Sequence, residues 1–286
     1  MNIKKTIFFT VVIALLISSF AAMAFAEAYK RPMPTHPLSY GNTVLGGNMP
    51  VVCVPLTATA KDKILEEAKF VAELKPDMVE VRADFWDCIE DTHASVAMLR
   101  DIDKIIGDVP MLLTVRIKAE RGYKDVSDKA KFNFYRAAAK EKLVELIDME
   151  LAYGEEKIQS FKKELVNSGI SLVVAYHDMN ATPTADEIVK IMDREIAAGA
   201  DIAKIVVKPN SEEDVLTFLK GILTFRRTYS KYPVIASASG DIGRISRLIG
   251  GLFGIDLTFA SGVKGSNPTQ MPVSVVREAL AVIYPN

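Results

Sequence analysis

The feature that most constrains this sequence is a regular alternation of short apolar segments and longer amphipathic segments, which starts near residue 51 and continues to the C-terminus. The apolar segments have the length and β-branched composition of buried strands, and the segments between them have the length of helices. The eight expected pairs are Val51–Leu56 with Lys61–Leu74, Met78–Ala83 with Ser95–Ile106, Pro110–Arg116 with Lys129–Lys142, Leu146–Leu151 with Glu155–Asn167, a strand from Leu172 with a helix at about Thr184–Ala198, a strand from Ile202 with the helix that follows it, Val234–Ser237 with Ile242–Leu248, and Asp256–Phe259 with Val273–Ile283. Eight such pairs in one domain predict a (β/α)8 TIM barrel, with a doubly wound open sheet as the alternative.

The first residues have the pattern of a secretory signal peptide. Lys4 and Lys5 precede an apolar run from Ile7 to about Ile17, and small residues follow up to Ala24-Phe25-Ala26. The run has about 11 residues, whereas a membrane-spanning helix needs about 20. We therefore expect residues 1–26 to be a signal peptide that is cleaved after Ala26. The processed protein is expected to be periplasmic or secreted and to have no stable membrane span. An uncleaved membrane anchor is the alternative.

Length and charge bound the remaining chain. Cleavage leaves 286 − 26 = 260 residues, which suits one barrel of about 250 residues. The formal charge of that part is 33 − 36 = −3, so the basic footprint of a nucleic-acid-binding protein is missing. Residues 27–49 are rich in Pro and Gly and predict a linker with a short hairpin around Gly41-Asn42, and residues 50–286 are expected to form the barrel.

Charged residues recur at every second position of several expected strands. Alternate residues of a strand share a face, and the face toward the helices should be apolar, so these residues are expected to point into the barrel. They are Glu80, Arg82 and Asp84; Thr114 and Arg116; Asp148 and Glu150; and Lys204 and Lys208. Charges of both signs inside a barrel must pair, and we expect them to form a pocket at its C-terminal mouth.

Two neighbouring strands carry the residues best suited to catalysis. Lys204 lies within the apolar run 201–209, where a charged amine is costly unless it is paired or neutral. His177 lies near the end of the preceding strand. A lysine amine in such surroundings can act as a nucleophile toward a carbonyl carbon, and the imidazole can move the proton. A structural ion pair is the alternative for the lysine.

No metal or cofactor is expected from the motifs. The three histidines, His36, His93 and His177, are placed too differently to form a plausible metal site. The stretch 239–247 contains glycines but neither a dinucleotide-binding fingerprint nor a P-loop lysine. The charged loop 118–122 is either a solvated connector or a mobile lid that brings a carboxylate over the mouth.

Several short motifs occur together in the chain. They are Glu80-x-Arg82-x-Asp84, Thr114-x-Arg116, Asp148-x-Glu150-Leu151, Tyr176-His177-Asp178, Lys204-Ile205-x-Val207-x-Pro209, Ile245-Ser246-Arg247, Thr258-Phe259 and Ser266-x-Pro268-x-Gln270. In this combination the chain resembles type I 3-dehydroquinate dehydratases from about Pro50 to the C-terminus. The resemblance implies a (β/α)8 barrel, a homodimer, no metal or cofactor, and conversion of 3-dehydroquinate to 3-dehydroshikimate and water through a lysine Schiff base.

The resemblance also implies a role for each matching residue. Lys204 would form the Schiff base, His177 would act as general acid and base, and Glu120 would assist from the loop 118–122. The expected substrate-binding residues are Glu80, Arg82 and Arg116, which would hold ring hydroxyls, and Arg247, Ser266 and Gln270, which would bind the carboxylate. The chain departs from the family pattern at Arg121, where a second glycine is usual, at Lys208, and in the small, polar segment 235–239.

Two other functions stay open at this point. Another Schiff-base enzyme, such as a class I aldolase, would use the same lysine on a different ketone, and a non-catalytic periplasmic protein would bind a cyclic polyol acid without turnover. The expected export also bears on the pathway, because an exported enzyme lacks access to cytoplasmic intermediates. We therefore expect a role in quinate catabolism rather than in the biosynthetic shikimate pathway, unless an uncleaved anchor keeps the barrel in the cytoplasm.

Overall fold

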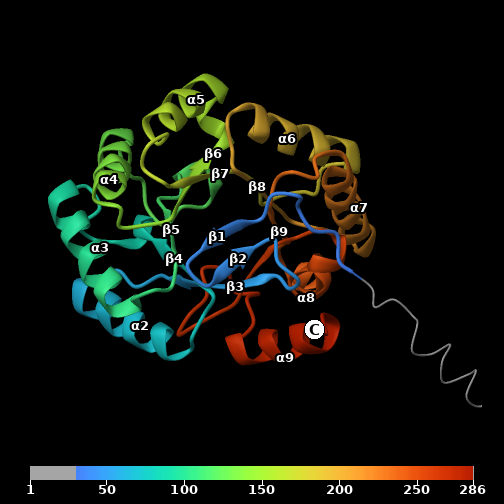
Figure 1. Ribbon diagram of the computed structural model, residues 1–286, viewed down its shortest axis with the longest axis horizontal. Coiled ribbons are helices and arrows are strands. Elements are labelled where there is room, and N and C mark those ends of the chain that lie inside the picture. The colour runs from blue at the N-terminus through green and yellow to red at the C-terminus, as the bar shows by residue number, and fades with distance from the viewer. Residues whose placement is uncertain (1–29, 286) are drawn as a thin grey trace, which may run out of the picture. The chain divides into compact units, whose positions relative to one another are not determined.

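The computed structural model describes residues 30–285, so the expected signal peptide lies outside the described residues. Within them, eight parallel strands close into a barrel in the order β10-β3-β4-β5-β6-β7-β8-β9, and helices form a ring around it (Figure 1). The strands are β3 (Val51–Leu56), β4 (Met78–Arg82), β5 (Met111–Thr114), β6 (Leu146–Glu150), β7 (Ser171–Asp178), β8 (Ile202–Val207), β9 (Val234–Ala238) and β10 (Leu257–Phe259). The predicted (β/α)8 barrel is confirmed, and the open sheet is wrong because β10 pairs with both β3 and β9.

The helices follow the strands as the amphipathic segments predict. They are α2 (Lys61–Glu73), α3 (Thr92–Ile106), α4 (Asp128–Glu141), α5 (Glu155–Glu164), α6 (Ala185–Ala197), α7 (Glu212–Thr228), α8 (Ser246–Ile249) and α9 (Val273–Ile283). Short 3-10 turns occur at η1 (Ala83–Phe85), η2 (Lys118–Glu120), η3 (Leu151–Tyr153), η4 (Ile242–Ile245) and η5 (Gly250–Phe253). The start of α6 shows how local sequence sets an element: Thr184 and Glu187 form a reciprocal capping box.

One expected element has a different form. Ile242–Leu248 is not a continuous α-helix, because the chain there forms η4, the four-residue helix α8 and then η5. Glycines disfavour a long helix, and these glycines are needed for close packing. A Cβ on Gly243 would lie 2.5 Å from the carbonyl oxygen of Ala238, and one on Gly250 would lie 2.6 Å from Cδ1 of Ile255. The tight path brings α8 against the ends of β9 and β10.

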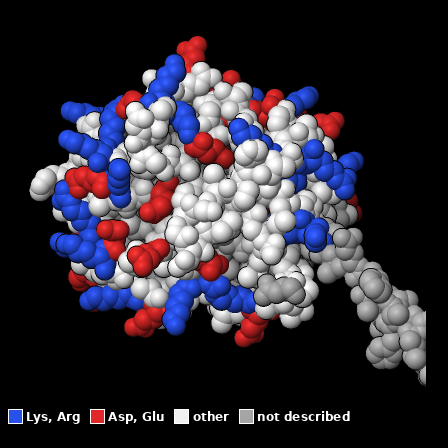
Figure 2. Space-filling model, viewed as in Figure 1, with Lys and Arg blue, Asp and Glu red and all other residues white. Residues whose placement is uncertain are grey.

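The predicted hairpin is confirmed and closes the barrel floor. It consists of β1 (Leu38–Tyr40) and β2 (Thr43–Leu45), and it lies across the centre of the barrel in Figure 1. Tyr40 and Leu45 share a buried apolar cluster with the first inward residues of the barrel strands. No Lys, Arg, Asp or Glu occurs between residues 32 and 60, and charged side chains in Figure 2 lie mainly around the rim of this face. The barrel interior therefore opens at the opposite end.

A buried ion cluster fixes the start of the described chain to the barrel. Asp256, directly before β10, accepts hydrogen bonds from Arg31 and from Arg226 of α7, and all three residues are buried. The backbone N–H of Val51 donates to the carbonyl oxygen of Asp256 at 2.9 Å. Arg31 is thereby held at the seam where the first and last barrel strands meet.

Two further findings apply to residues 30–285. None of the helices there combines the length and the apolar character needed to cross a membrane. No group of three or more His, Cys, Asp or Glu side chains in that part of the chain is arranged to hold a metal ion.

Candidate active site

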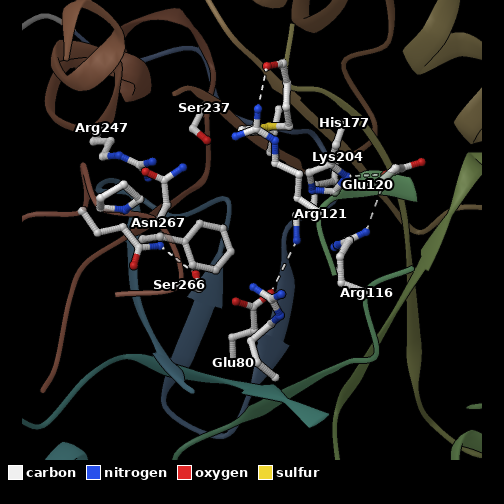
Figure 3. A pocket seen from close by; sticks show the side chains of 16 residues that line it. Glu80, Arg116, Glu120, Arg121, His177, Lys204, Ser237, Arg247, Ser266 and Asn267 are labelled. Carbon is white, nitrogen blue, oxygen red and sulfur yellow. Dashed lines mark hydrogen bonds and ion pairs between the residues drawn. The ribbon is translucent and has the colours of Figure 1, made fainter. Parts of the chain in front are cut away.

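All nine site residues predicted from the sequence lie in one pocket at the C-terminal ends of the strands (Figure 3). Glu80 and Arg82 come from β4, His177 from β7 and Lys204 from β8, whereas Arg116, Glu120, Arg247, Ser266 and Gln270 come from the segments that follow strands. Arg121, Met179, Val206, Ser237, Phe259, Asn267 and Pro268 complete the lining. The strand-parity argument explains why the inward residues converge at this end of the barrel.

Lys204 is buried at the bottom of this pocket and is held by two carboxylates. Its Nζ donates to Oδ2 of Asp148 at 2.6 Å and lies 3.7 Å from Oε1 of Glu80. The ammonium also lies 5.2 Å from the centre of the Phe259 ring, a cation–π arrangement. Its backbone N–H donates to Oε2 of the buried Glu195, which comes from α6 behind the strand. The two carboxylates and the Phe259 ring therefore hold the ammonium within the pocket.

A chain of buried ion pairs surrounds the lysine. Arg116 donates from Nη2 to Asp148 and from Nη1 to Glu150, both at 2.9 Å, and Glu150 also pairs with Lys131 of α4. Burial opposes ionisation of Asp148, but Arg116 and Lys204 outweigh it and hold the pKa of Asp148 well below its usual value. A buried carboxylate that stays ionised next to the lysine can neutralise either an ammonium or a protonated imine.

His177 and Glu120 form a hydrogen-bonded pair above the lysine. Nδ1 of His177 and Oε2 of Glu120 are 2.7 Å apart. Burial raises the pKa of Glu120 to about 7, although Arg116 opposes this shift. Burial, Arg116 and Lys204 lower the pKa of His177 well below its usual value. The imidazole is therefore neutral at neutral pH, and its second ring nitrogen, Nε2, is left for the substrate.

The opposite side of the pocket carries a cation without an acid. Arg247 is 4% exposed, and no carboxylate of the described residues pairs with it. Its Nε is buried without a hydrogen-bond partner there, and burial lowers its pKa to about 10. Nε2 of Gln270 donates to Oγ of Ser266 at 3.1 Å, while Oε1 of Gln270 is left without a partner. An unpaired buried guanidinium beside polar groups is suited to bind a carboxylate.

Some site residues were missing from the sequence-based assignment. Asp148 and Glu150 were expected inside the barrel, but their pairing with Lys204 and Arg116 was not, although strand parity gave the signal. Met179 lines the pocket without any local motif that marks it, and Ser237 lies in the segment 235–239, which departs from the family pattern. Arg121 was noted only as a departure and also lines the pocket, whereas Lys208 is not among the lining residues.

A family model and similar sequence relatives point to the same protein family. The model of a family described as type I 3-dehydroquinase matches residues 52–286. A 3-dehydroquinate dehydratase from Alkaliphilus oremlandii is 35% identical over 240 residues, which cover 84% of this chain and 94% of the relative. A 3-dehydroquinate dehydratase from Bacillus velezensis is 35% identical over 242 residues, which cover 85% of this chain and 96% of that relative.

Solved structures agree with the sequence relatives. The crystal structure of 3-dehydroquinate dehydratase from Geobacillus kaustophilus has a TM-score of 0.86 at 34% identity and covers 90% of this chain and 100% of its own. The type I enzyme from Clostridium difficile, with covalent modified comenic acid, has a TM-score of 0.84 at 31% identity. Its match covers 87% of this chain and 98% of the C. difficile chain. From its sequence, its barrel and its matched length, this chain belongs to the type I 3-dehydroquinase family.

Proposed function

We propose that this chain is a 3-dehydroquinate dehydratase, a hydro-lyase that forms 3-dehydroshikimate and water through a Schiff base on Lys204. The observation that carries the proposal is the arrangement of one pocket: a buried lysine lies beside a neutral histidine, and Arg247 lies without an acid elsewhere in the lining. A substrate with a ketone and a carboxylate matches these two chemistries. The names of the relatives and the covalently modified ligand of the C. difficile enzyme support the same assignment.

The first chemical step is formation of the imine. The ammonium of Lys204 gives up one proton, and the resulting amine attacks the ketone carbon. That proton then returns as the carbonyl oxygen leaves as water, so that a protonated imine remains and the charge is conserved. Its positive charge takes the place of the ammonium charge beside Asp148 and Glu80. Because Asp148 is already ionised and both side chains are fixed by hydrogen bonds and ion pairs, they stabilise the protonated imine without rearrangement.

The second step is removal of water from the imine. The protonated imine withdraws electrons, so the neighbouring C–H becomes acidic and Nε2 of His177 takes its proton, which leaves an enamine. The enamine electrons then expel the hydroxyl group from the next carbon, and the imidazolium returns its proton so that water leaves. One water molecule hydrolyses the conjugated imine, and this releases the enone product and restores the amine of Lys204.

Borohydride trapping tests this proposal directly. Wild-type protein with 3-dehydroquinate and borohydride should carry a reduced adduct on Lys204, and without borohydride it should produce the absorbance of an enone. Lys204→Met should lose both signals while its unfolding curve keeps a single transition. Lys208→Met is the matched control, because Lys208 follows the same strand but does not line the pocket; it should keep both.

The trapping experiment also separates the alternatives. An adduct on Lys204 without conversion of 3-dehydroquinate would indicate another Schiff-base lyase, such as an aldolase. Tight binding of a cyclic polyol acid with neither adduct nor enone would indicate a binding protein. An adduct that maps to Lys208 would overturn the assignment of the nucleophile.

We further propose that the enzyme is exported and acts in quinate catabolism as a homodimer. The basic and apolar residues before Ala26 support export, and the family resemblance supports the dimer. Fractionation of the native host with N-terminal sequencing tests the location: mature protein that begins near Glu27 in the periplasm is expected. Full-length protein with a protease-protected cytoplasmic barrel would contradict it. Sedimentation equilibrium of the processed protein tests the dimer.

A further inference from the structure

The cations that line the pocket divide into two kinds. Arg82, Arg116 and Lys204 each pair with a buried carboxylate, so their charges are neutralised within the protein. Arg121 and Arg247 also line the pocket, but neither has a carboxylate partner among the described residues. The pocket therefore presents two guanidinium groups without an acid to a ligand. The proposed carboxylate site uses Arg247, so Arg121 is left without an assigned role.

The backbone at Arg121 gives the residue a fixed direction. Arg121 ends the turn η2 with φ 63°, a left-handed conformation that is costly for a residue with a Cβ. The turn is tight, because a Cβ on Gly122 would lie 2.1 Å from the carbonyl oxygen of Arg116. A residue that retains a strained conformation next to a catalytic group is a candidate for a functional role.

The side chain of Arg121 reaches from this turn into the pocket. In Figure 3 it runs toward the part of the pocket where Ser237 lies, and Nη2 donates to the carbonyl oxygen of Met179 at 3.3 Å. This contact joins the loop 118–122 to the segment after β7. It is a single long hydrogen bond to a neutral acceptor, so a carboxylate that enters the pocket is a stronger acceptor for the same guanidinium.

We propose that Arg121 is a second carboxylate-binding residue, which moves from Met179 to the substrate and completes a two-arginine site with Arg247. The inference rests on the proposed function, because it takes the substrate to be an anionic polyol acid with a single carboxylate. Two guanidinium groups from different walls of the pocket select for an anionic ligand more strongly than one group does.

The position of Arg121 also ties carboxylate binding to the catalytic pair. Glu120, its neighbour in the turn, holds Nδ1 of His177 at 2.7 Å. A substrate carboxylate that holds Arg121 therefore also holds the turn that carries Glu120. A ketone without a carboxylate would leave Arg121 on Met179, and the turn would keep only the contacts it has without substrate, among them those of Glu120 with His177 and Arg116.

Calorimetric titration with a matched pair of ligands tests the inference. Quinate is a cyclic polyol carboxylate without a ketone, so it binds without forming an imine, and its carboxamide has the same shape without the charge. Arg121→Gln should weaken quinate binding at least tenfold, which corresponds to about 1.4 kcal/mol, and change carboxamide binding less than twofold. Its KM for 3-dehydroquinate should rise at least tenfold.

Further variants separate contact with the carboxylate from support of the turn. Arg121→Gly relieves the left-handed backbone and should weaken quinate as much as Arg121→Gln does, whereas Arg121→Lys should restore part of the affinity. Lys118→Gln, an exposed change in the same turn, should bind both ligands as the wild type does. Equal weakening of quinate and carboxamide by Arg121→Gln, or no weakening of either, would overturn the inference.

The same measurements keep the two proposals distinct. If the wild type converts 3-dehydroquinate and Arg121→Gln keeps the wild-type KM and quinate affinity, only the role of Arg121 is refuted. Wild-type protein that does not convert 3-dehydroquinate would refute the proposed function, and selective loss of quinate binding in Arg121→Gln would still support the two-arginine site.

Discussion

Replacing Glu120 by glutamine should remove the acidic limb of the pH–rate profile. When Glu120 is ionised, its carboxylate accepts the Nδ1–H of His177, and Nε2 carries the lone pair that a general base needs. When Glu120 is protonated, it donates to Nδ1, and the ring proton moves to Nε2. Burial, together with Arg116, Lys204 and Arg82, lowers the pKa of His177 and outweighs Asp148, so a second proton on this ring is disfavoured. The proton on Glu120 therefore decides which neutral tautomer faces the substrate.

The size of the effect follows from the pKa of Glu120, which burial raises to about 7. The ionised fraction, 1/(1 + 10^(7−pH)), is about 0.9 at pH 8 and about 0.01 at pH 5, so kcat/KM of the wild type should fall about 90-fold between these values. In the Glu120→Gln variant, the amide oxygen of the new side chain accepts from Nδ1–H at both pH values. The profile of this variant should therefore be flat across the range. Its plateau should lie at least tenfold below the wild type at pH 8, because a hydrogen bond to a charged acceptor contributes about 1.5–3 kcal/mol.

The assay is the initial rate of enone formation at subsaturating 3-dehydroquinate from pH 5 to pH 9. Lys118→Gln serves as control, since it changes an exposed charge of the same turn and should keep the wild-type inflection. An inflection near pH 7 that persists in Glu120→Gln would refute the reasoning. A wild-type profile that stays level from pH 5 to pH 8 would refute it as well.

Three other perturbations have defined outcomes. His177→Ala should lower kcat by about 10²–10⁴-fold, yet borohydride should still trap an adduct on Lys204, as mass spectrometry would show. Arg247→Gln should raise KM at least tenfold with little change in the free energy of unfolding, because it breaks no ion pair. Asp256→Ala leaves two buried arginines without their acid and should lower the free energy of unfolding, measured by urea denaturation, by about 3–5 kcal/mol. A loss under about 1 kcal/mol would contradict the conclusion that Asp256 neutralises both arginines.

The fold was largely predictable because the barrel strands are short, buried and mostly apolar segments that alternate regularly with amphipathic helices. Val51–Leu56 and Val273–Ile283 have the predicted bounds. The segment after β9 was not predictable from periodicity, because its shape depends on how closely Gly243 approaches Ala238. Periodicity describes one element at a time, whereas this contact joins two.

The members of the site were predictable, and their pairing was not. Strand parity identifies Glu80, Asp148 and Lys204 as inward residues, because the alternation of faces is a local property of each strand. Which carboxylate lies 2.6 Å from Nζ depends on the register between strands that are far apart in sequence. The lack of an acid near Arg247 depends in the same way on the whole lining. Sequence alone therefore gives the residues of the pocket but not its charge balance.

The contact between Arg31 and Asp256 affects when the barrel can close during synthesis. The two residues are 225 positions apart, and a ribosome that adds about 5–20 residues per second needs about 11–45 s to make the segment between them. During this time the first barrel strand has no last strand to pair with, and Arg31 has no buried acid to bind. Any factor that engages the N-terminal end while the chain is being made therefore meets a polypeptide whose barrel is still open.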